Sequence, residues 1–210
     1  MLTDDKIRQY CLQLSTPADS VLRALERETH LRTLYPQMLS GPLQGLLLQL
    51  LSQMIRPGRI LEIGTFTGYS AICLARGLAP DGVLHTIEVD DELTPIIRKY
   101  FHLAGLTHKI VLHVGDAAVI VPDLAEMFDL VFLDAGKMDY ARHYELVLPK
   151  IRSGGILLAD NVLWGGKVLD EYADQTTRIL HAFNNMVHAD NRVENLLLPL
   201  RDGLMVVRKH

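Results

Sequence analysis

Cysteine is scarce in this 210-residue sequence: only Cys11 and Cys73 occur, and they form no metal-binding or redox motif. Both lie in apolar helical patterns, so we expect two reduced thiols and a cytoplasmic protein. The first residues include Asp4 and Asp5 and show no signal-peptide pattern. No apolar run approaches the length of a transmembrane helix, since Gln49 interrupts residues 46–51. The sequence therefore predicts no membrane partner.

An excess of basic charge is also missing. Lys and Arg number 21 against 25 Asp and Glu, which gives a net charge of −4 and argues against a general nucleic-acid binder. No internal repeat, linker or low-complexity segment divides the chain. We expect a single domain over residues 1–210, long enough to bury a substantial core.

The most informative feature of the sequence is a glycine-containing turn that follows a predicted strand. Residues 59–63 form a short apolar run that predicts a buried strand, and a helical pattern starts after Gly64 and Gly68. Phe66 stands where a dinucleotide-binding turn needs its middle glycine, so NAD and FAD are disfavoured. Glu62 would repel a phosphate but suits a ligand that carries an ammonium and a sulfonium, such as S-adenosylmethionine. The alternative is a tight turn that binds nothing.

Acidic residues follow the next two predicted strands. Glu88 ends a strand over residues 83–89 and lies 26 residues after Glu62, about the spacing that places an acid beside a ribose. Its alternative is an ordinary solvated acid. Asp116 follows a strand over residues 109–114 and could accept from an adenine amino group, while Ala117 could offer its backbone N–H. For Asp116, a helix N-cap is the equally weighted alternative.

The remaining pattern alternates helices and strands, which predicts a three-layer α/β fold. Thr16 is the expected N-cap of a helix that runs to Arg32, after a short helix over residues 4–14. An apolar stripe predicts a helix that packs on the sheet and contains Leu43, Leu46, Leu47, Leu50, Leu51, Met54 and Ile55. Leu48 adds apolar surface outside the stripe, so burial of this helix on more than one side is the alternative. Further helices are expected over residues 93–104, 140–148 and 174–187, strands over 128–133 and 156–159, and an antiparallel hairpin over 193–200 and 204–207.

Three side-chain oxygens are expected at one edge of this sheet. Asp134 ends one apolar strand, and Asp160 and Asn161 end the next. An all-oxygen set suits Mg²⁺, and the absence of a neighbouring His or Cys argues against zinc. Lys137 lies three residues after Asp134, where a divalent cation would disfavour its ammonium form and let it act as a base. The alternatives are a common Asp-Asn turn and a solvated loop lysine.

Together these segments resemble the cation-dependent O-methyltransferases, the family of caffeoyl-CoA and catechol O-methyltransferases. The matching stretches lie within about residues 35–208 and are residues 61–70, 87–90, 134–140, 160–164 and 198–204. The resemblance implies a Rossmann-like class I methyltransferase fold, with a seven-stranded, mostly parallel sheet whose last strand is antiparallel and with helices on both faces. It also implies a homodimer, and a helical extension over residues 1–35 that shapes the acceptor pocket.

Roles carry over to matching positions. S-adenosylmethionine would be held by Glu62, Gly64, Thr65, Ser70, Glu88, Asp116, Ala117 and Asp134, with Ser40 a further candidate. Asp134, Asp160 and Asn161 would hold the metal. Lys137 would be the general base and contact substrate, beside Trp164 as a wall of the acceptor site.

Two departures from the plant members leave the acceptor open. Gly136 replaces an aspartate near the cofactor, and Gly165 replaces an asparagine that touches substrate, so caffeoyl-CoA is not implied. We expect methyl transfer to one hydroxyl of a vicinal diol, such as a catechol, on a small phenolic molecule. The alternatives are a tRNA 5-hydroxyuridine methyltransferase and, less favoured, a cofactor-binding protein without catalysis.

Overall fold

The computed structural model describes residues 5–170 and 174–210 of the chain. Among these residues, no helix is both long enough and apolar enough to cross a membrane. The sequence-based expectation for residue 4 lies outside the described part.

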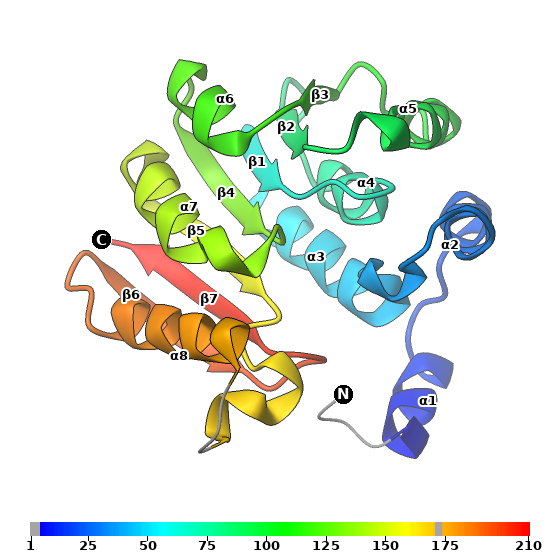
Figure 1. Cartoon of the computed structure of the whole chain (residues 1–210). Helices are drawn as coiled ribbons and strands as arrows, with labels where there is room; N and C mark the ends of the chain where they lie inside the picture. The colour runs from blue at the N-terminus through cyan, green and yellow to red at the C-terminus, as the bar shows by residue number, and fades with distance from the viewer. Residues whose placement is uncertain (1–4, 171–173) are drawn as a thin grey trace.

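A seven-stranded sheet forms the centre of the molecule (Figure 1). The strands are β1 (Arg59–Ile63), β2 (Val83–Glu88), β3 (Ile110–Val114), β4 (Phe128–Leu133), β5 (Ile151–Asp160), β6 (Val193–Leu198) and β7 (Leu204–Lys209). Their order is β3-β2-β1-β4-β5-β7-β6, and β7 runs antiparallel to both of its neighbours. This confirms the predicted mostly parallel sheet with an antiparallel last strand.

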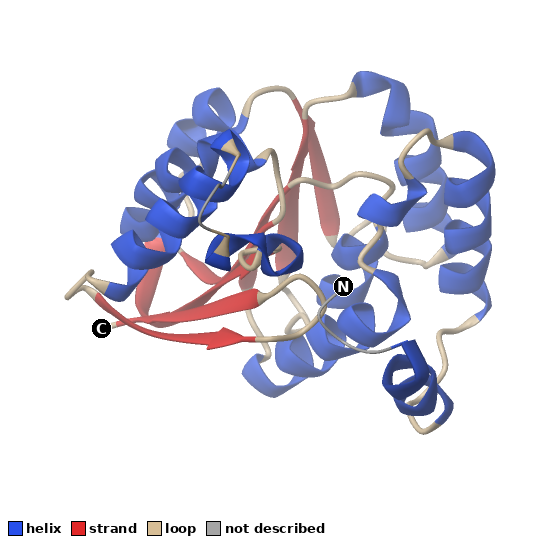
Figure 2. Ribbon diagram, turned by 60° about the horizontal axis from the view of Figure 1, so that its bottom comes forward, coloured by secondary structure: helices blue, strands red, loops and turns tan. Residues whose placement is uncertain are grey.

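Helices cover both faces of the sheet (Figures 1 and 2). One layer contains α2 (Ser20–Arg32), α3 (Gly41–Ile55), α4 (Tyr69–Ala75) and α5 (Thr94–Leu103), and the other contains α6 (Ala117–Asp123), α7 (Tyr140–Val147) and α8 (Gln175–His188). The short α1 (Asp5–Gln13) contacts α3. Four single turns of 3-10 helix lie at η1 (Pro36–Met38), η2 (Asp91–Leu93), η3 (Lys137–Asp139) and η4 (Leu148–Lys150), and a longer 3-10 segment, η5 (Trp164–Leu169), is kinked at Gly165 and Gly166.

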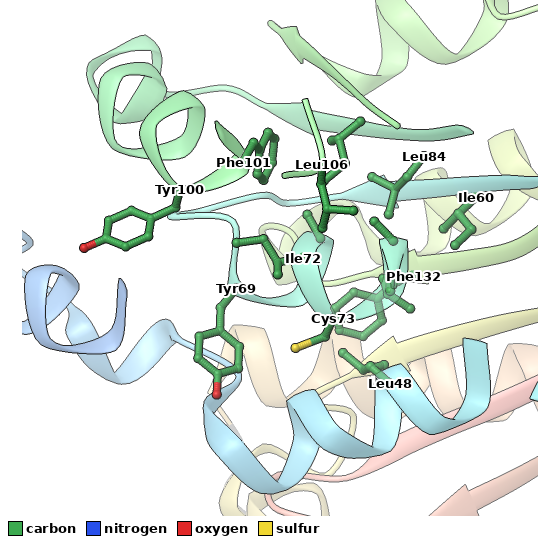
Figure 3. Close-up of a cluster of buried hydrophobic side chains, with 14 of the residues drawn as sticks. Leu48, Ile60, Tyr69, Ile72, Cys73, Leu84, Tyr100, Phe101, Leu106 and Phe132 are labelled. Carbon is green, nitrogen blue, oxygen red and sulfur yellow. The ribbon is translucent and has the colours of Figure 1, made fainter. Parts of the chain in front are cut away.

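Each face of the sheet has its own apolar core, because the central parallel strands are buried on both sides. On the α3–α4 side, Ile60, Leu84 and Phe132 of the strands meet helix residues such as Leu48 and Cys73 (Figure 3). The α7–α8 side has a second cluster of comparable size around strand residues such as Leu61 and Val131. The continuous apolar runs of the strands in the sequence reflect this two-sided burial.

Helix α3 is buried on more than one side: Leu47, Leu51 and Ile55 of the leucine stripe pack against the same core as Leu48, which lies outside the stripe. Leu48 is fully buried, whereas Leu50 and Met54 of the stripe are exposed and the other five stripe residues are only half-buried. Small residues at the contact between α3 and α4 decide how closely the two helices pack. A Cβ on Gly45 would lie 2.5 Å from Cε1 of Tyr69, and a Cβ on Gly77 would lie 2.3 Å from the backbone of Ser52. These contacts bring α3 close to α4 along the Gly45–Ser52 side, which the count of leucines does not reveal.

Two expected boundaries are also wrong. The N-cap of α2 is Asp19, whose carboxylate accepts from the backbone N–H of Leu22 at 3.0 Å, and not Thr16. As an N-cap, an aspartate side chain can accept a hydrogen bond from an N–H of the first helical turn as well as a threonine side chain can. Strand β5 begins at Ile151, five residues earlier than expected, because it continues past Gly154 and Gly155 with an irregular register against β4.

The buried face of α3 can be tested by truncation. We expect Leu48→Ala to lower the free energy of unfolding by about 2–5 kcal/mol, since it leaves a cavity in a closed core. Met54→Ala, on the predicted but exposed stripe, should cost less than about 1 kcal/mol. Urea unfolding of both variants measures the difference. Equal losses of unfolding free energy in the two variants would contradict the exposed position of Met54.

Candidate active site

A cavity of about 1170 Å³ lies at the carboxyl ends of the parallel strands. Its walls come from residues 32–40, from the turns after β1, β2, β3 and β4, and from Asn161, Trp164, Arg201 and Asp202. Of the sequence-predicted site residues, it is lined by Ser40, Gly64, Thr65, Ser70, Glu88, Asp116, Ala117, Asp134, Lys137, Asn161 and Trp164. Glu62 and Asp160 are buried behind this lining.

The glycine turn is required first by the protein's own packing. Gly64 has φ +100°, and a Cβ there would lie 2.1 Å from the carbonyl oxygen of Asp134. Gly68 has φ +94°, and a Cβ there would lie 2.8 Å from the ring of Phe101. Both positions therefore need glycine before any ligand is considered. Because β1 pairs directly with β4, the backbone of Asp134 lies against the turn at Gly64.

Glu88 is fixed at the end of β2 by three backbone donors. Its carboxylate accepts from the N–H groups of Phe66 at 2.6 Å, Val89 at 2.9 Å and Asp90 at 3.0 Å. Burial nonetheless raises the pKa of Glu88. A carboxylate held this firmly at a cavity wall is a preorganised acceptor for a ligand hydroxyl. Oε1 already accepts from Val89 and Asp90, whereas Oε2 accepts only from Phe66 and can accept a second bond.

Glu62 forms a buried polar chain beneath the turn. The Thr86 hydroxyl donates to Glu62 Oε2 at 2.5 Å, and the Thr65 and Thr86 hydroxyls are 2.5 Å apart. Burial raises the pKa of Glu62 to about 8, and the carboxylates of Asp134 and Glu88 act in the same direction. Since Thr65 lines the cavity and Glu62 does not, the hydroxyls connect this acid to the cavity wall.

Asp116 caps a helix, as its alternative reading proposed. Its carboxylate accepts from the Ala118 N–H at 2.8 Å and begins α6, with Ala117 as the first helical residue. Both residues also line the cavity, so Asp116 caps the helix and is still available for contact with a ligand. Ser70 lies in the first turn of α4, and Ser40 directly precedes α3; both are buried side chains at the cavity wall.

Two carboxylates, Asp134 and Asp160, lie close together at the ends of β4 and β5. The strands pair in parallel with Leu133 opposite Ala159, so Asp134 and Asp160 follow side by side. Burial raises the pKa of Asp160 to about 6, the charge of Asp134 adds to this rise, and the Gln44 amide opposes it. Asn161 follows with φ +59°. In residues 5–170 and 174–210, no group of three or more His, Cys, Asp or Glu could hold a metal ion, so any cation here would depend on the amide oxygen of Asn161.

Lys137 is held next to these acids. Its Nζ donates to Asp134 Oδ1 at 2.9 Å and to the Tyr140 hydroxyl at 2.8 Å, and its side chain is mostly buried. The Tyr140 hydroxyl in turn donates to the carbonyl oxygen of Asp160 at 2.8 Å. Burial raises the pKa of Tyr140 far above its usual range, so the hydroxyl keeps its proton. The solvated-lysine alternative does not fit this position.

Three residues of the site, Tyr140, Gln44 and Arg201, are assigned no role by the sequence patterns. Tyr140 follows Lys137 by one helical turn, a spacing that could have suggested contact. Gln44 lies inside the leucine-rich helix, and Arg201 lies in the β6–β7 turn, yet the Arg201 guanidinium donates to the Gln44 side chain. Their separation of 157 residues leaves no local pattern to find.

Comparison with known proteins agrees with this geometry. A family model described as O-methyltransferase matches residues 13–210. A catechol O-methyltransferase from Niastella koreensis is 37% identical over 170 residues, covering 79% of this chain and 77% of the relative. The O-methyltransferase TomG from Streptomyces achromogenes, solved with S-adenosylmethionine, has a TM-score of 0.90 at 32% identity and covers 97% of this chain and 96% of its own. An O-methyltransferase from Bacillus cereus, solved with S-adenosylhomocysteine, has a TM-score of 0.89 at 30% identity with 97% coverage of both chains.

The buried Glu62 should make stability depend on pH. Because its pKa rises from 4.5 to about 8 on folding, the folded chain holds a proton that the unfolded chain has lost. Stability should therefore fall with rising pH across this window, by up to about 1.4 kcal/mol per unit from this group. In ligand-free Glu62→Gln, that share of the decline should disappear.

Urea unfolding between pH 5 and pH 8 measures the effect. Glu92→Gln is the matched control, because the Glu92 side chain is exposed and its replacement should leave the pH profile unchanged. Parallel profiles for wild type and Glu62→Gln would show that Glu62 is already ionised in the folded chain.

Proposed function

The chain belongs to the O-methyltransferase family, and we propose that it transfers the methyl group of S-adenosylmethionine to one hydroxyl of a vicinal diol, such as a catechol, on a small phenolic molecule with a divalent cation bound. The observation that carries this proposal is the meeting of Asp134, Asp160 and Lys137 at the ends of β4 and β5. These groups share a cavity with the candidate cofactor contacts, so donor and acceptor could meet there.

The cofactor would lie along the turns after β1, β2 and β3. Solved relatives contain S-adenosylmethionine or S-adenosylhomocysteine, which supports this ligand. Glu88, fixed by three N–H groups, would accept from the ribose hydroxyls. Glu62, which is buried below the cavity wall, would influence the cofactor through the hydroxyls of Thr86 and Thr65. The other proposed contacts are Ser40, Gly64, Ser70, Asp116, Ala117 and Asp134.

The acidic end of the cavity fits a hard divalent cation such as Mg²⁺. Asp160 is buried beside Asp134, and their mutual repulsion would be relieved by a positive ion between them. With the amide of Asn161, the side chains offer only oxygen atoms, which suits Mg²⁺. A cation bound there supplies positive charge that favours the ionised hydroxyl of the acceptor and the uncharged amine of Lys137.

Lys137 is the proposed base. Asp134 Oδ1 and the Tyr140 hydroxyl hold its Nζ at the cavity wall. Nζ would take the proton of one acceptor hydroxyl, and that oxygen would attack the methyl carbon in line with the sulfonium. The new C–O bond forms as the C–S bond breaks, which leaves S-adenosylhomocysteine and a protonated lysine. Orientation of the two reactants contributes much of the remaining rate.

The acceptor end of the cavity has open space. Gly136 lines the cavity and has no atom within 4 Å of where a Cβ would lie. Gly165 has the same open space, outside the cavity lining. Trp164, with φ +48°, stands at the cavity wall beside Asn161 and would bound the aromatic ring of the acceptor. Residues 32–35, at the end of the N-terminal helical segment, line the same cavity and would help to shape this end.

We also propose a cytoplasmic homodimer. Both cysteines are free, which suits a reducing compartment. Ile7, Tyr10 and Leu14 in and after α1 expose more than half of their side chains, and contact with a second copy would cover them. Light scattering should give twice the chain mass of 23.6 kDa, and a concentration-independent single-chain mass would exclude the dimer.

The acceptor and the cation are tested together. With Mg²⁺ we expect methylation of a simple catechol, loss of turnover in excess EDTA, and no comparable turnover on phenol, which lacks the second oxygen. Product formation from labelled S-adenosylmethionine measures all three. Full turnover in EDTA, or equal turnover on phenol, would contradict the diol–cation proposal. Turnover only on tRNA that carries 5-hydroxyuridine would show that the acceptor is tRNA and not a small phenolic molecule.

Removing the base tests its role separately. Lys137→Ala should lower kcat by about 10²–10⁴-fold, the usual contribution of a general base, while the affinity for S-adenosylhomocysteine stays nearly unchanged. Lys109→Ala, at the opposite end of the strands, is the control. A rise in KM with kcat unchanged would show that Lys137 only positions the acceptor.

A further inference from the structure

The buried face of α7 carries a histidine that the chain leaves without a hydrogen-bond partner. This face consists of Tyr140, His143, Tyr144 and Val147. Both tyrosine hydroxyls have hydrogen-bond partners within the chain. The His143 ring has none among residues 5–170 and 174–210, and its Nδ1 is shut off from solvent. His143 is therefore the member of this face whose polar atoms the described chain does not satisfy.

His143 also differs from the rest of this face because it reaches the cavity. The residue is only 7% exposed, yet it lines the cavity, whereas Tyr140, Tyr144 and Val147 do not. Since Nδ1 is enclosed, Nε2 is the ring nitrogen that a ligand in the cavity can reach. A buried imidazole thus presents one polar edge to the ligand space.

This edge of His143 is a hydrogen-bond donor. Burial lowers the pKa of His143, although the charges of Asp139 and Asp116 act in the opposite direction. The ring is therefore neutral at pH 7 and carries one proton, on either nitrogen. In folded proteins an enclosed N–H without an acceptor is rarer than an enclosed acceptor without a donor. The proton therefore belongs on Nε2, which offers an N–H to the cavity.

Packing alone does not explain a histidine at this position. An enclosed Nδ1 without a partner costs folding free energy, and an apolar side chain of similar size would avoid that cost. The other three residues of the face fill the core of the α7–α8 side without leaving such an atom. A use for the second ring nitrogen, Nε2, accounts for the imidazole.

The position of His143 in the cavity indicates which part of the cofactor it would meet. Helix α7 packs against α6, and Asp116 and Ala117 at the start of α6 line the same cavity. The strand that leads to them is next to Glu88, since the Gly115 N–H donates to the Glu88 carbonyl at 2.8 Å. With the ribose at Glu88, the base would extend toward Asp116 and His143.

Adenine offers groups that match these residues. Its 6-amino group is a donor, and the ring nitrogens N1 and N7 on either side of that group are acceptors. The Asp116 carboxylate uses Oδ1 for the Ala118 N–H, which leaves Oδ2 for the amino group. The Ala117 N–H is the proposed donor to N1. The acceptor on the other side of the amino group, N7, then needs a donor from a different element.

We propose that His143 is an adenine-binding residue, whose Nε2–H donates to N7 of the base. The inference rests on the proposed function, since it takes S-adenosylmethionine as the ligand and Glu88 as its ribose contact. It adds a residue from α7 to a cofactor site that is otherwise built from the strand ends and from the starts of α3, α4 and α6.

The test compares S-adenosylhomocysteine with its 7-deaza analogue, in which a C–H replaces N7. We expect the wild type to bind the analogue about three- to thirtyfold more weakly, because the Nε2–H then lacks its acceptor. His143→Phe should bind the two ligands equally well. Calorimetry measures the four affinities. The control is His181→Phe, an exposed histidine of α8 outside the cavity lining, which should discriminate between the ligands as the wild type does.

Two results would overturn the role of His143. One is equal binding of both ligands by the wild type, which needs no variant and so does not depend on the folding of one. The other is a His143→Phe variant that keeps the wild-type preference, since N7 would then be recognised by another group. If the wild type binds neither ligand, the proposed cofactor site fails and this inference fails with it. Binding of S-adenosylhomocysteine without any preference over the analogue removes His143 alone.

Discussion

Burial of several carboxylates close to one another governs the functional edge of this sheet. Parallel pairing of β1 with β2 and β4, and of β4 with β5, brings Glu62, Glu88, Asp134 and Asp160 to the same edge. Burial and neighbouring charge raise the pKa of Glu62, Glu88 and Asp160, so each would ionise more easily beside a cation. Lys137 supplies one positive charge from within the chain. A sulfonium cofactor and a divalent cation would supply the rest, and the binding of both would relieve the strain of assembling these acids.

The polar groups that hold these acids define what each can do. Glu88 is fixed by three backbone N–H groups, while Glu62 lies beneath the cavity and reaches its wall only through threonine hydroxyls. The Asp160 carboxylate accepts from the Asn161 N–H at 2.8 Å, and the nearby Gln44 amide opposes the rise in its pKa. Since these partners come from different elements, the chemistry of the site depends on the packing of α3 and of the β6–β7 turn as much as on the strand ends.

Sequence reasoning succeeds where one local pattern decides the structure. The strand that ends at Ile63, the glycine turn and the acids at the strand ends follow from short apolar runs and from the geometry of parallel sheets. It is incomplete for α3, where Leu47, Leu51 and Ile55 of the stripe pack against the core but Gly45 and Ser52 decide which side approaches α4. It also misses Arg201, because nothing near that residue in the chain announces contacts with Ser40 and Gln44. Such contacts appear only once the β6–β7 turn and the start of α3 are placed in space.

The central claim is that Asp134, Asp160 and Asn161 would hold one divalent cation, and that Lys137 would take the proton of an acceptor hydroxyl beside it. The most direct measurement is a crystal structure with Mn²⁺, S-adenosylhomocysteine and catechol, in which anomalous scattering locates the ion. The account predicts a single Mn²⁺ in contact with those three side chains and both catechol oxygens, with one oxygen within hydrogen-bond reach of Lys137 Nζ. An ion at another position, or a catechol bound through one oxygen away from Lys137, would contradict it.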